Sequence, residues 1–145
     1  MAEYRDSVDI DAAPEVVFDY LVTEAGMTAW MGQHATLEPR VGGVFAVDIA
    51  GHPVRGQYLR VERPRRVVVS WGFAGSAELP AGTSTVEFRL VPHGTGTRLH
   101  LTHSGLPGTA VRGHADGWTH FLARIAVAAV GRDPGPDPWR PLPDR

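Results

Sequence analysis

The sequence contains no cysteine, no lysine and no asparagine, and it has no long run of apolar residues. The absence of cysteine excludes disulfide bonds, thiolate metal sites and cysteine nucleophiles. Because no stretch approaches the roughly 20 apolar residues of a membrane span, we expect no membrane-spanning segment. Residues 1–11 are acidic and lack the apolar region of a signal peptide, so we expect a cytoplasmic protein.

The charge balance does not favour a polyanionic partner. The 14 basic residues, all arginine, stand against 16 acidic residues and leave a formal net charge of −2, which favours neither nucleic acid nor an anionic membrane. A chain of 145 residues with 43% hydrophobic residues suits one domain. We place this domain at residues 1–131 and expect a proline-rich tail at 132–145.

Residues 111–130 give the strongest helix prediction. Apolar residues recur with helical periodicity and form one broad face that includes Trp118, Leu122 and Ile125. Gly131 follows where a C-terminal cap belongs. The opposite, polar face carries Asp116, Thr119, His120 and Arg124.

Most of the remaining chain has the pattern of strands. Alternating apolar and polar residues predict strands at 4–10, 44–50, 54–62, 67–73, 83–91 and 97–104. Irregular alternation near Tyr58 predicts a β-bulge. Two short helices are expected after the first strand, one starting at Pro14 and one over 24–31. Short turns between the later strands imply an antiparallel meander with one face covered by the long helix.

The order of these elements and several short motifs resemble the START/Bet v 1-like superfamily. The motifs are Ala13-Pro14-Glu15-Val16-Val17-Phe18, Trp30, Gly42-Gly43-Val44-Phe45, the segment 62–68 with Trp71, the segment 97–107, and Gly117-Trp118. Together they are similar to the activator of Hsp90 ATPase homologue 1-like family, in its bacterial single-domain form. The resemblance implies an α+β helix-grip (Bet v 1-like) fold, in which a curved antiparallel sheet of about six to seven strands wraps around a long C-terminal helix.

Members of this superfamily often hold an apolar or aromatic ligand between the sheet and the last helix. The inward register predicts that such a ligand would contact Phe45, Tyr58, Trp71, Phe88, His103, His114, Trp118 and Leu122. The same residues would also fill a solid core, and the sequence leaves both interpretations open. The eukaryotic co-chaperone role belongs to longer proteins with an additional domain, so the resemblance is weak support for Hsp90 activation.

Three functions therefore remain open, and binding of a small apolar or aromatic molecule is preferred over catalysis. A cofactor-free enzyme of the polyketide cyclase or dehydratase kind would use His103, His114 or Tyr58 as acid or base. An interaction protein associated with chaperones would act through its surface, with Trp139 as one contact. No catalytic residue is assigned, no cofactor is expected, and a homodimer stays open.

The histidines do not predict a metal site. His100 and His103 are three residues apart on a strand and therefore point to opposite faces. His114 and His120 are six residues apart and lie on different faces of the helix. No pair has the spacing of metal ligands.

Overall fold

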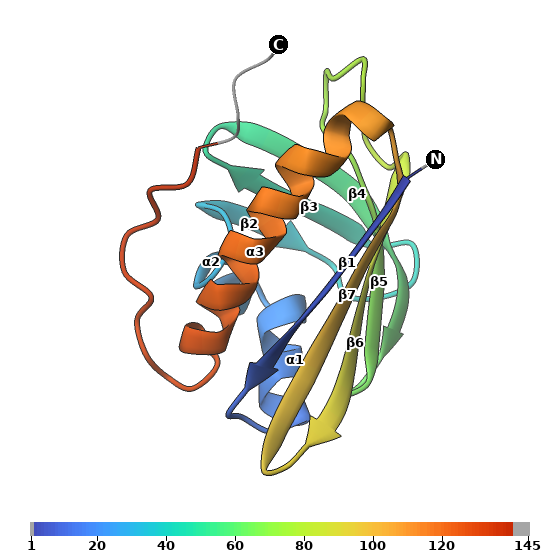
Figure 1. Cartoon of the computed structure of the whole chain (residues 1–145). Coiled ribbons are helices and arrows are strands. Elements are labelled where there is room, and N and C mark those ends of the chain that lie inside the picture. The colour runs from blue at the N-terminus through green and yellow to red at the C-terminus, as the bar shows by residue number, and fades with distance from the viewer. Residues whose placement is uncertain (1, 141–145) are drawn as a thin grey trace.

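The computed structural model describes residues 2–140, in which an antiparallel seven-stranded sheet curves around one long helix (Figure 1). The strands are β1 (Ala2–Ile10), β2 (His34–Leu37), β3 (Val44–Ile49), β4 (His52–Glu62), β5 (Arg66–Trp71), β6 (Ser84–His93) and β7 (Gly96–Leu106). The helices are α1 (Pro14–Val22), α2 (Glu24–Thr28), the 3₁₀ turn η1 (Gly108–Ala110) and α3 (Val111–Ala128). The predicted helix-grip fold is confirmed.

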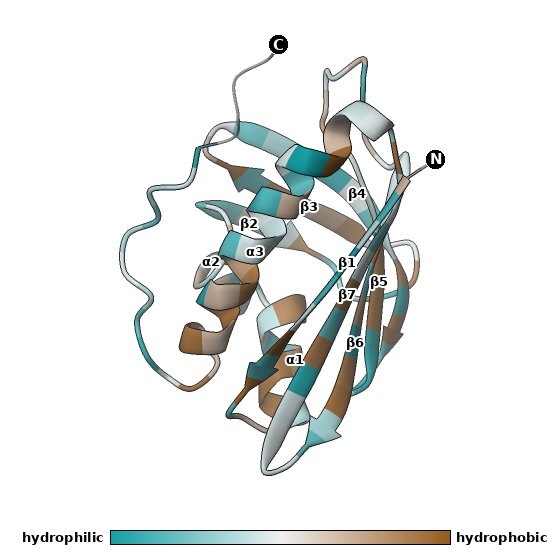
Figure 2. Cartoon of the chain, in the orientation of Figure 1, coloured by the Kyte–Doolittle hydropathy of each residue, from teal (hydrophilic) through white to brown (hydrophobic). Residues whose placement is uncertain are grey.

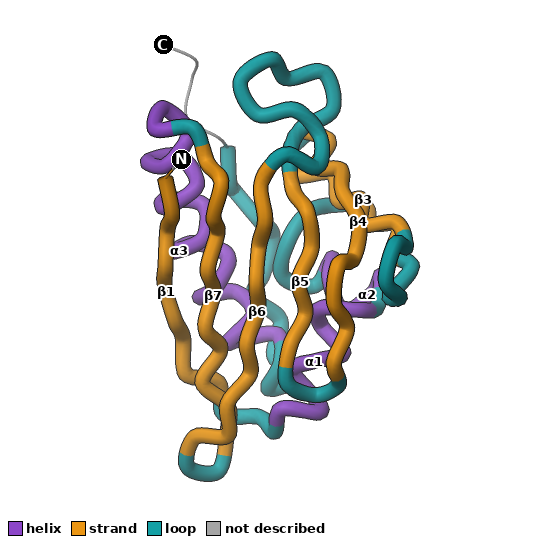
Figure 3. The backbone as a smooth tube through the Cα atoms, turned by 90° about the vertical axis from the view of Figure 1, so that its right-hand side faces the viewer, coloured by secondary structure: helices purple, strands orange, loops and turns teal. Residues whose placement is uncertain are grey.

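The strand order β1-β7-β6-β5-β4-β3-β2 places β1 and β2 at the two edges of the sheet. Figure 3 shows β1, β7, β6, β5 and β4 side by side, with α3 behind β1 and β7. The register of β4 against β5 shifts between Tyr58 and Arg60, where the sequence predicts a bulge. Strand β2 was not predicted, because a strand of four residues shows too little alternation to be recognised.

Helix α3 ends in the cap that the sequence predicts. Gly131 has φ of +82°, its N–H donates to the carbonyl of Ala128, and the N–H of Arg132 donates to the carbonyl of Val127. These two bonds form a Schellman motif, which favours glycine at the position of Gly131 because that residue adopts the left-handed conformation. The second helix ends at Thr28 and is therefore shorter than the predicted 24–31. Within residues 2–140 we find no helix with the length and apolar character needed to cross a membrane.

The inward faces of the strands and of α3 meet in one apolar core. Brown and teal segments alternate along β6 and β7 in Figure 2, as expected for a sheet with one buried face. In β6, Val86 and Phe88 are at most 1% exposed, whereas Arg89 is exposed. Among the strands, α3 packs most closely on β1. Large side chains bridge the distance from α3 to the middle of the sheet.

The turn between β4 and β5 is tied to α1 by Arg63. Its guanidinium carbon lies 4.6 Å from the centroid of the Phe18 ring. The same group donates to the carboxylates of Asp19 at 2.8 Å and Glu15 at 3.3 Å. One side chain thereby joins the end of the sheet to the first helix through a cation–π contact and two ion pairs.

Residues 132–140 run along the polar face of α3 without forming a helix or strand (Figure 1). They cover His120 and Arg124, whose side chains are 28% and 13% exposed. The helical period shows which face is polar, but only the folded chain shows that this face carries the tail instead of solvent.

Candidate functional site

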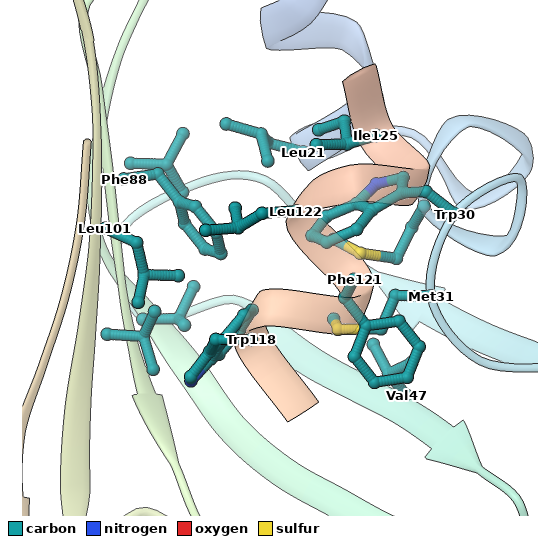
Figure 4. Packing of buried hydrophobic residues seen from close by; sticks show 14 of the residues in the cluster. Leu21, Trp30, Met31, Val47, Phe88, Leu101, Trp118, Phe121, Leu122 and Ile125 are labelled. Carbon is teal, nitrogen blue, oxygen red and sulfur yellow. The ribbon is translucent and has the colours of Figure 1, made fainter. Parts of the chain in front are cut away.

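The eight side chains predicted to contact a ligand all come from the inward faces of the sheet and of α3, and the Tyr58 hydroxyl among them reaches α1. His114 is half-buried, and the exposed fraction of every other one is at most 3%. Figure 4 shows Phe88, Trp118 and Leu122 close together, where the strands face the helix. The sequence therefore selected residues that the fold brings into one cluster, contributed by five strands and one helix.

Trp71 is at the centre of the aromatic part of this cluster. Its ring centroid lies 5.2 Å from that of Trp118 and 6.0 Å from that of Phe45. The His103 ring is 5.6 Å from Trp71, and Phe88 is 5.9 Å from Trp118. Because these are the separations of tilted and edge-to-face contacts, the rings touch one another directly.

His103, on β7, has both ring nitrogens engaged. The indole N–H of Trp118 donates to Nδ1 over 3.0 Å. The Ser84 hydroxyl donates to the carbonyl of Trp71 at 2.7 Å, so its oxygen faces Nε2 of His103 as an acceptor at 2.8 Å. Nε2 must then carry the proton, and the imidazole is the neutral Nε2–H tautomer.

His114, at the start of α3, takes the opposite tautomer. Its Nδ1 lies 2.9 Å from the carbonyl oxygen of Ala110, which can only accept, so Nδ1 carries the proton. Nε2 is left to accept the indole N–H of Trp71 at 3.3 Å. This bond is the longest in the network and, by its length, the weakest. The two imidazole centroids are 5.0 Å apart.

Burial keeps both imidazoles uncharged near neutral pH. The loss of solvent, with a smaller effect of the neighbouring His114, lowers the pKa of His103 to about 2. Burial also lowers the pKa of His114. Burial raises the pKa of Tyr58, because loss of solvent disfavours the charged phenolate. The Tyr58 hydroxyl donates to the carbonyl of Leu21 at 3.0 Å.

Ser84 and His103 have the separation of a nucleophile and its base but not the required protonation. A catalytic histidine accepts the hydroxyl proton at its free nitrogen. Here Nε2 of His103 already carries a proton, and the serine proton is donated to Trp71. The remaining lone pair, at Nδ1, accepts from Trp118. The arrangement therefore joins β5, β6, β7 and α3 and does not prepare a nucleophile.

Two residues of the cluster are missing from the predicted set. Ser84 lies directly opposite Trp71 in the β5–β6 ladder and is 2% exposed. The alternation of β6 puts it on the same face as Phe88, so the pattern already contained this signal. Phe73 is half-buried, and its ring centroid is 5.8 Å from that of His114.

The cluster reaches the surface between α3 and the loop 72–83, which joins β5 to β6. Figure 1 shows this loop beside the start of α3. The Thr109 hydroxyl donates to the carboxylate of Glu78, which ties the loop to η1. Phe73 from the loop and His114 from α3 form the half-buried rim of the cluster. Among the residues described, no group of three or more His, Cys, Asp or Glu side chains could hold a metal ion.

Comparisons with known proteins identify relatives of this chain. The sequence profile of the family described as activator of Hsp90 ATPase homolog 1-like protein matches residues 11–129. An AHSA1-like protein from Rhizobium etli, known from its solution NMR structure, is 38% identical with a TM-score of 0.74, and the match covers 99% of this chain and 92% of that one.

Two further solved structures have the same fold. CalU16 from Micromonospora echinospora is 28% identical with a TM-score of 0.76, covering 92% of this chain and 69% of that one. The Aha1 dimer from Colwellia psychrerythraea is 21% identical with a TM-score of 0.77, covering 89% and 96%, and demonstrates similarity of fold alone. Among curated protein sequences, none matches this chain.

Proposed function

Because this chain belongs to the family of activator of Hsp90 ATPase homolog 1-like proteins, we propose that it binds a small apolar or aromatic molecule between the sheet and α3. The half-buried contact between His114 and Trp71 carries the proposal. It is the longest hydrogen bond of the cluster, at 3.3 Å, and it lies at the rim. A donor on the ligand can replace the indole N–H at Nε2 of His114 when the same ligand also accepts from that indole, because Trp71 is buried and its N–H would otherwise be left unpaired.

The chemistry of the rim suits a planar aromatic ligand. The aromatic rings contact one another directly, so a ligand has to displace side chains in order to enter between them. The ring of Phe73 is 6.5 Å from Trp71 and 5.8 Å from His114, in edge-on and tilted contacts. An aromatic ligand restores such contacts when it takes the place of one of these rings, whereas an aliphatic ligand does not.

The polar groups of His103 and Tyr58 support binding better than acid–base catalysis, which leaves His114 as the one weakly engaged base among the three candidates. A general base needs an available lone pair at working pH. The free lone pair of His103 accepts the indole N–H of Trp118, and the Tyr58 hydroxyl donates its proton to a backbone carbonyl. The cyclase or dehydratase alternative would first have to break these buried bonds, and leaving the donors or acceptors unpaired would cost about 1–3 kcal/mol each.

The first test is native mass spectrometry of freshly purified chain, compared with the mass after denaturation. An additional mass that is lost on denaturation supports the proposal, and its formula gives the ligand class. The second test titrates the chain with the aromatic probe 1-anilinonaphthalene-8-sulfonate and follows the fluorescence of the probe. We expect saturable binding with one site per folded chain.

Substitutions locate the bound probe. His114→Leu removes the acceptor at the rim and should weaken probe binding about tenfold. His100→Leu is the matched control, because His100 lies on the opposite face of β7 from His103 and should bind the probe as the wild type does. A chain that carries no additional mass and binds no probe, or equal weakening by both substitutions, would count against the proposal.

A further inference from the structure

The tail forms a specific aromatic contact with α3. Trp139 stacks on the His120 ring, with 5.4 Å between centroids and 24° between planes, and meets Phe121 edge-on at 5.6 Å. A Cβ at Gly117 would lie 3.4 Å from Cζ2 of Trp139, so the indole is in contact with the helix backbone. Gly117, His120 and Phe121 together form a seat for one indole ring, which we call the indole seat.

A buried carboxylate is held next to the indole seat. Asp137 has a side chain only 9% exposed, and Oδ1 faces Nε2 of His120 at 2.7 Å. The N–H of Trp139 donates to the same oxygen at 3.0 Å. Arg124 lies 3.9 Å from the other oxygen. The helix therefore offers two nitrogen groups to an acidic side chain that stands two residues before the tryptophan.

Arg124 also holds the backbone of the tail. Its guanidinium donates to the carbonyls of Gly135 at 3.1 Å and Pro134 at 3.5 Å, and to the carbonyl of Trp30 in the turn that follows α2. Backbone carbonyls are common to every peptide, whereas the carboxylate and the indole are particular to this one. The tail-covered face of α3 thus combines general contacts to an extended chain with two selective contacts.

We propose that this face of α3 is a docking site for an extended peptide segment of a partner protein, with an acidic residue two positions before a tryptophan. The chain's own tail occupies this face until such a segment displaces it. The seated tail shows that this chemistry fits, and the charges of Arg124 and Asp137 show why an acidic partner is preferred. The surface is on the outside of α3 and is separate from the proposed interior ligand.

The tether opposes displacement, but it also allows the tail to dock with contacts that are weak in themselves. A short flexible tether holds a segment at an effective concentration on the order of millimolar, so weak intrinsic affinity suffices for docking within one chain. Gly131 and Gly135 have φ of +82° and +83° and give the tether its turns. A partner segment of moderate affinity can then compete once it is abundant or when the tail is disabled.

The test uses the full chain and a fluorescent synthetic peptide with the sequence of residues 132–140. Trp139→Ala in the chain disables its own tail and should raise the affinity for this peptide at least about tenfold over the wild type, by removing the competitor. Peptides carrying Asp137→Asn or Trp139→Ala should bind the disabled chain at least about tenfold more weakly. Anisotropy gives the affinities, and thermal unfolding checks that the variant is folded.

Three results would overturn the proposal. Two of them are the absence of peptide binding to the folded Trp139→Ala chain and equal binding of all three peptides. The other is a wild-type chain that dimerises with rising concentration and becomes monomeric on Trp139→Ala, which would identify a second copy, and not a partner protein, as the occupant. Adding His120→Ala to the disabled chain provides the matched control, since it removes the stacking face and should abolish the gain in affinity.

Discussion

Nδ1 of His103 accepts the indole N–H of Trp118, and this 3.0 Å bond joins β7 to α3 in the centre of the core. The network continues from Nε2 of His103 to the Ser84 hydroxyl and from there to the carbonyl of Trp71. Among the described residues, every buried side-chain nitrogen and oxygen has a hydrogen-bond partner. A fully satisfied polar chain in an apolar core fixes the relative positions of the strands and the helix.

The two buried histidines should show opposite tautomers. The hydrogen bonds require a proton at Nε2 of His103 and at Nδ1 of His114. Long-range proton–nitrogen correlation spectra at neutral pH distinguish these forms directly through the nitrogen shifts. Finding His103 protonated at Nδ1 would contradict the network and would reopen its role as a base toward Ser84.

Ser84→Ala should destabilise the chain by about 1–3 kcal/mol, because the Nε2–H of His103 and the carbonyl of Trp71 both lose their partner in a buried site. Urea unfolding followed by tryptophan fluorescence measures the change. Ser104→Ala is the matched control: it lies opposite Thr85 on the outward side of β7, and its substitution should change the free energy of unfolding by less than about 0.5 kcal/mol. Similar losses in both variants would show that the network adds no stability.

The free energy of unfolding should fall as the pH drops below about 6.5, the ordinary pKa of histidine. In the unfolded chain His103 takes up a proton in this range, whereas burial holds its pKa at about 2 in the folded chain. The unfolded state therefore binds more protons, and one such histidine costs up to about 1.4 kcal/mol per pH unit. The lowered pKa of His114 acts in the same direction. Above pH 6.5 the histidines are mostly neutral in the unfolded chain as well, so this loss in the free energy of unfolding disappears.

Urea unfolding between about pH 6.5 and 5 measures this slope before most carboxylates titrate. His103→Gln removes the titrating group. The slope of the free energy of unfolding against pH should therefore decrease by the contribution of nearly one proton, even if the variant is less stable at every pH. A slope identical to that of the wild type would show that His103 is protonated in the folded chain.

Arg63→Met should lower the free energy of unfolding by about 0.5–1.5 kcal/mol, since it removes the cation–π contact with Phe18 and the ion pairs with Glu15 and Asp19. The loss should shrink in high salt, which screens the ion pairs. Arg65→Met is the matched control two residues away, where the side chain is exposed and makes no ion pair within residues 2–140. Thermal unfolding at low and high salt compares the two.

The order of the elements and the inward faces of the strands follow from local pattern and could be predicted. Alternation put Phe45, Phe88 and His103 on buried faces, and the helical period did the same for Trp118. Turn chemistry predicted the cap at Gly131, which lies just beyond the end of α3 at Ala128. These features depend on residues near in sequence. The short strand β2 escaped prediction because it is held by pairing with β3, which no local pattern of four residues reveals.

What the sequence by itself determined is the fold and the list of inward side chains, because periodicity specifies which face each residue occupies. Only the tertiary structure decided what these side chains do to one another. The tautomers of His103 and His114 depend on donors and acceptors from other elements, and the seat of Trp139 depends on a helix that the tail folds back upon. Hydrogen bonds and ring contacts join residues far apart in the chain, so their partners are known only once the chain is folded.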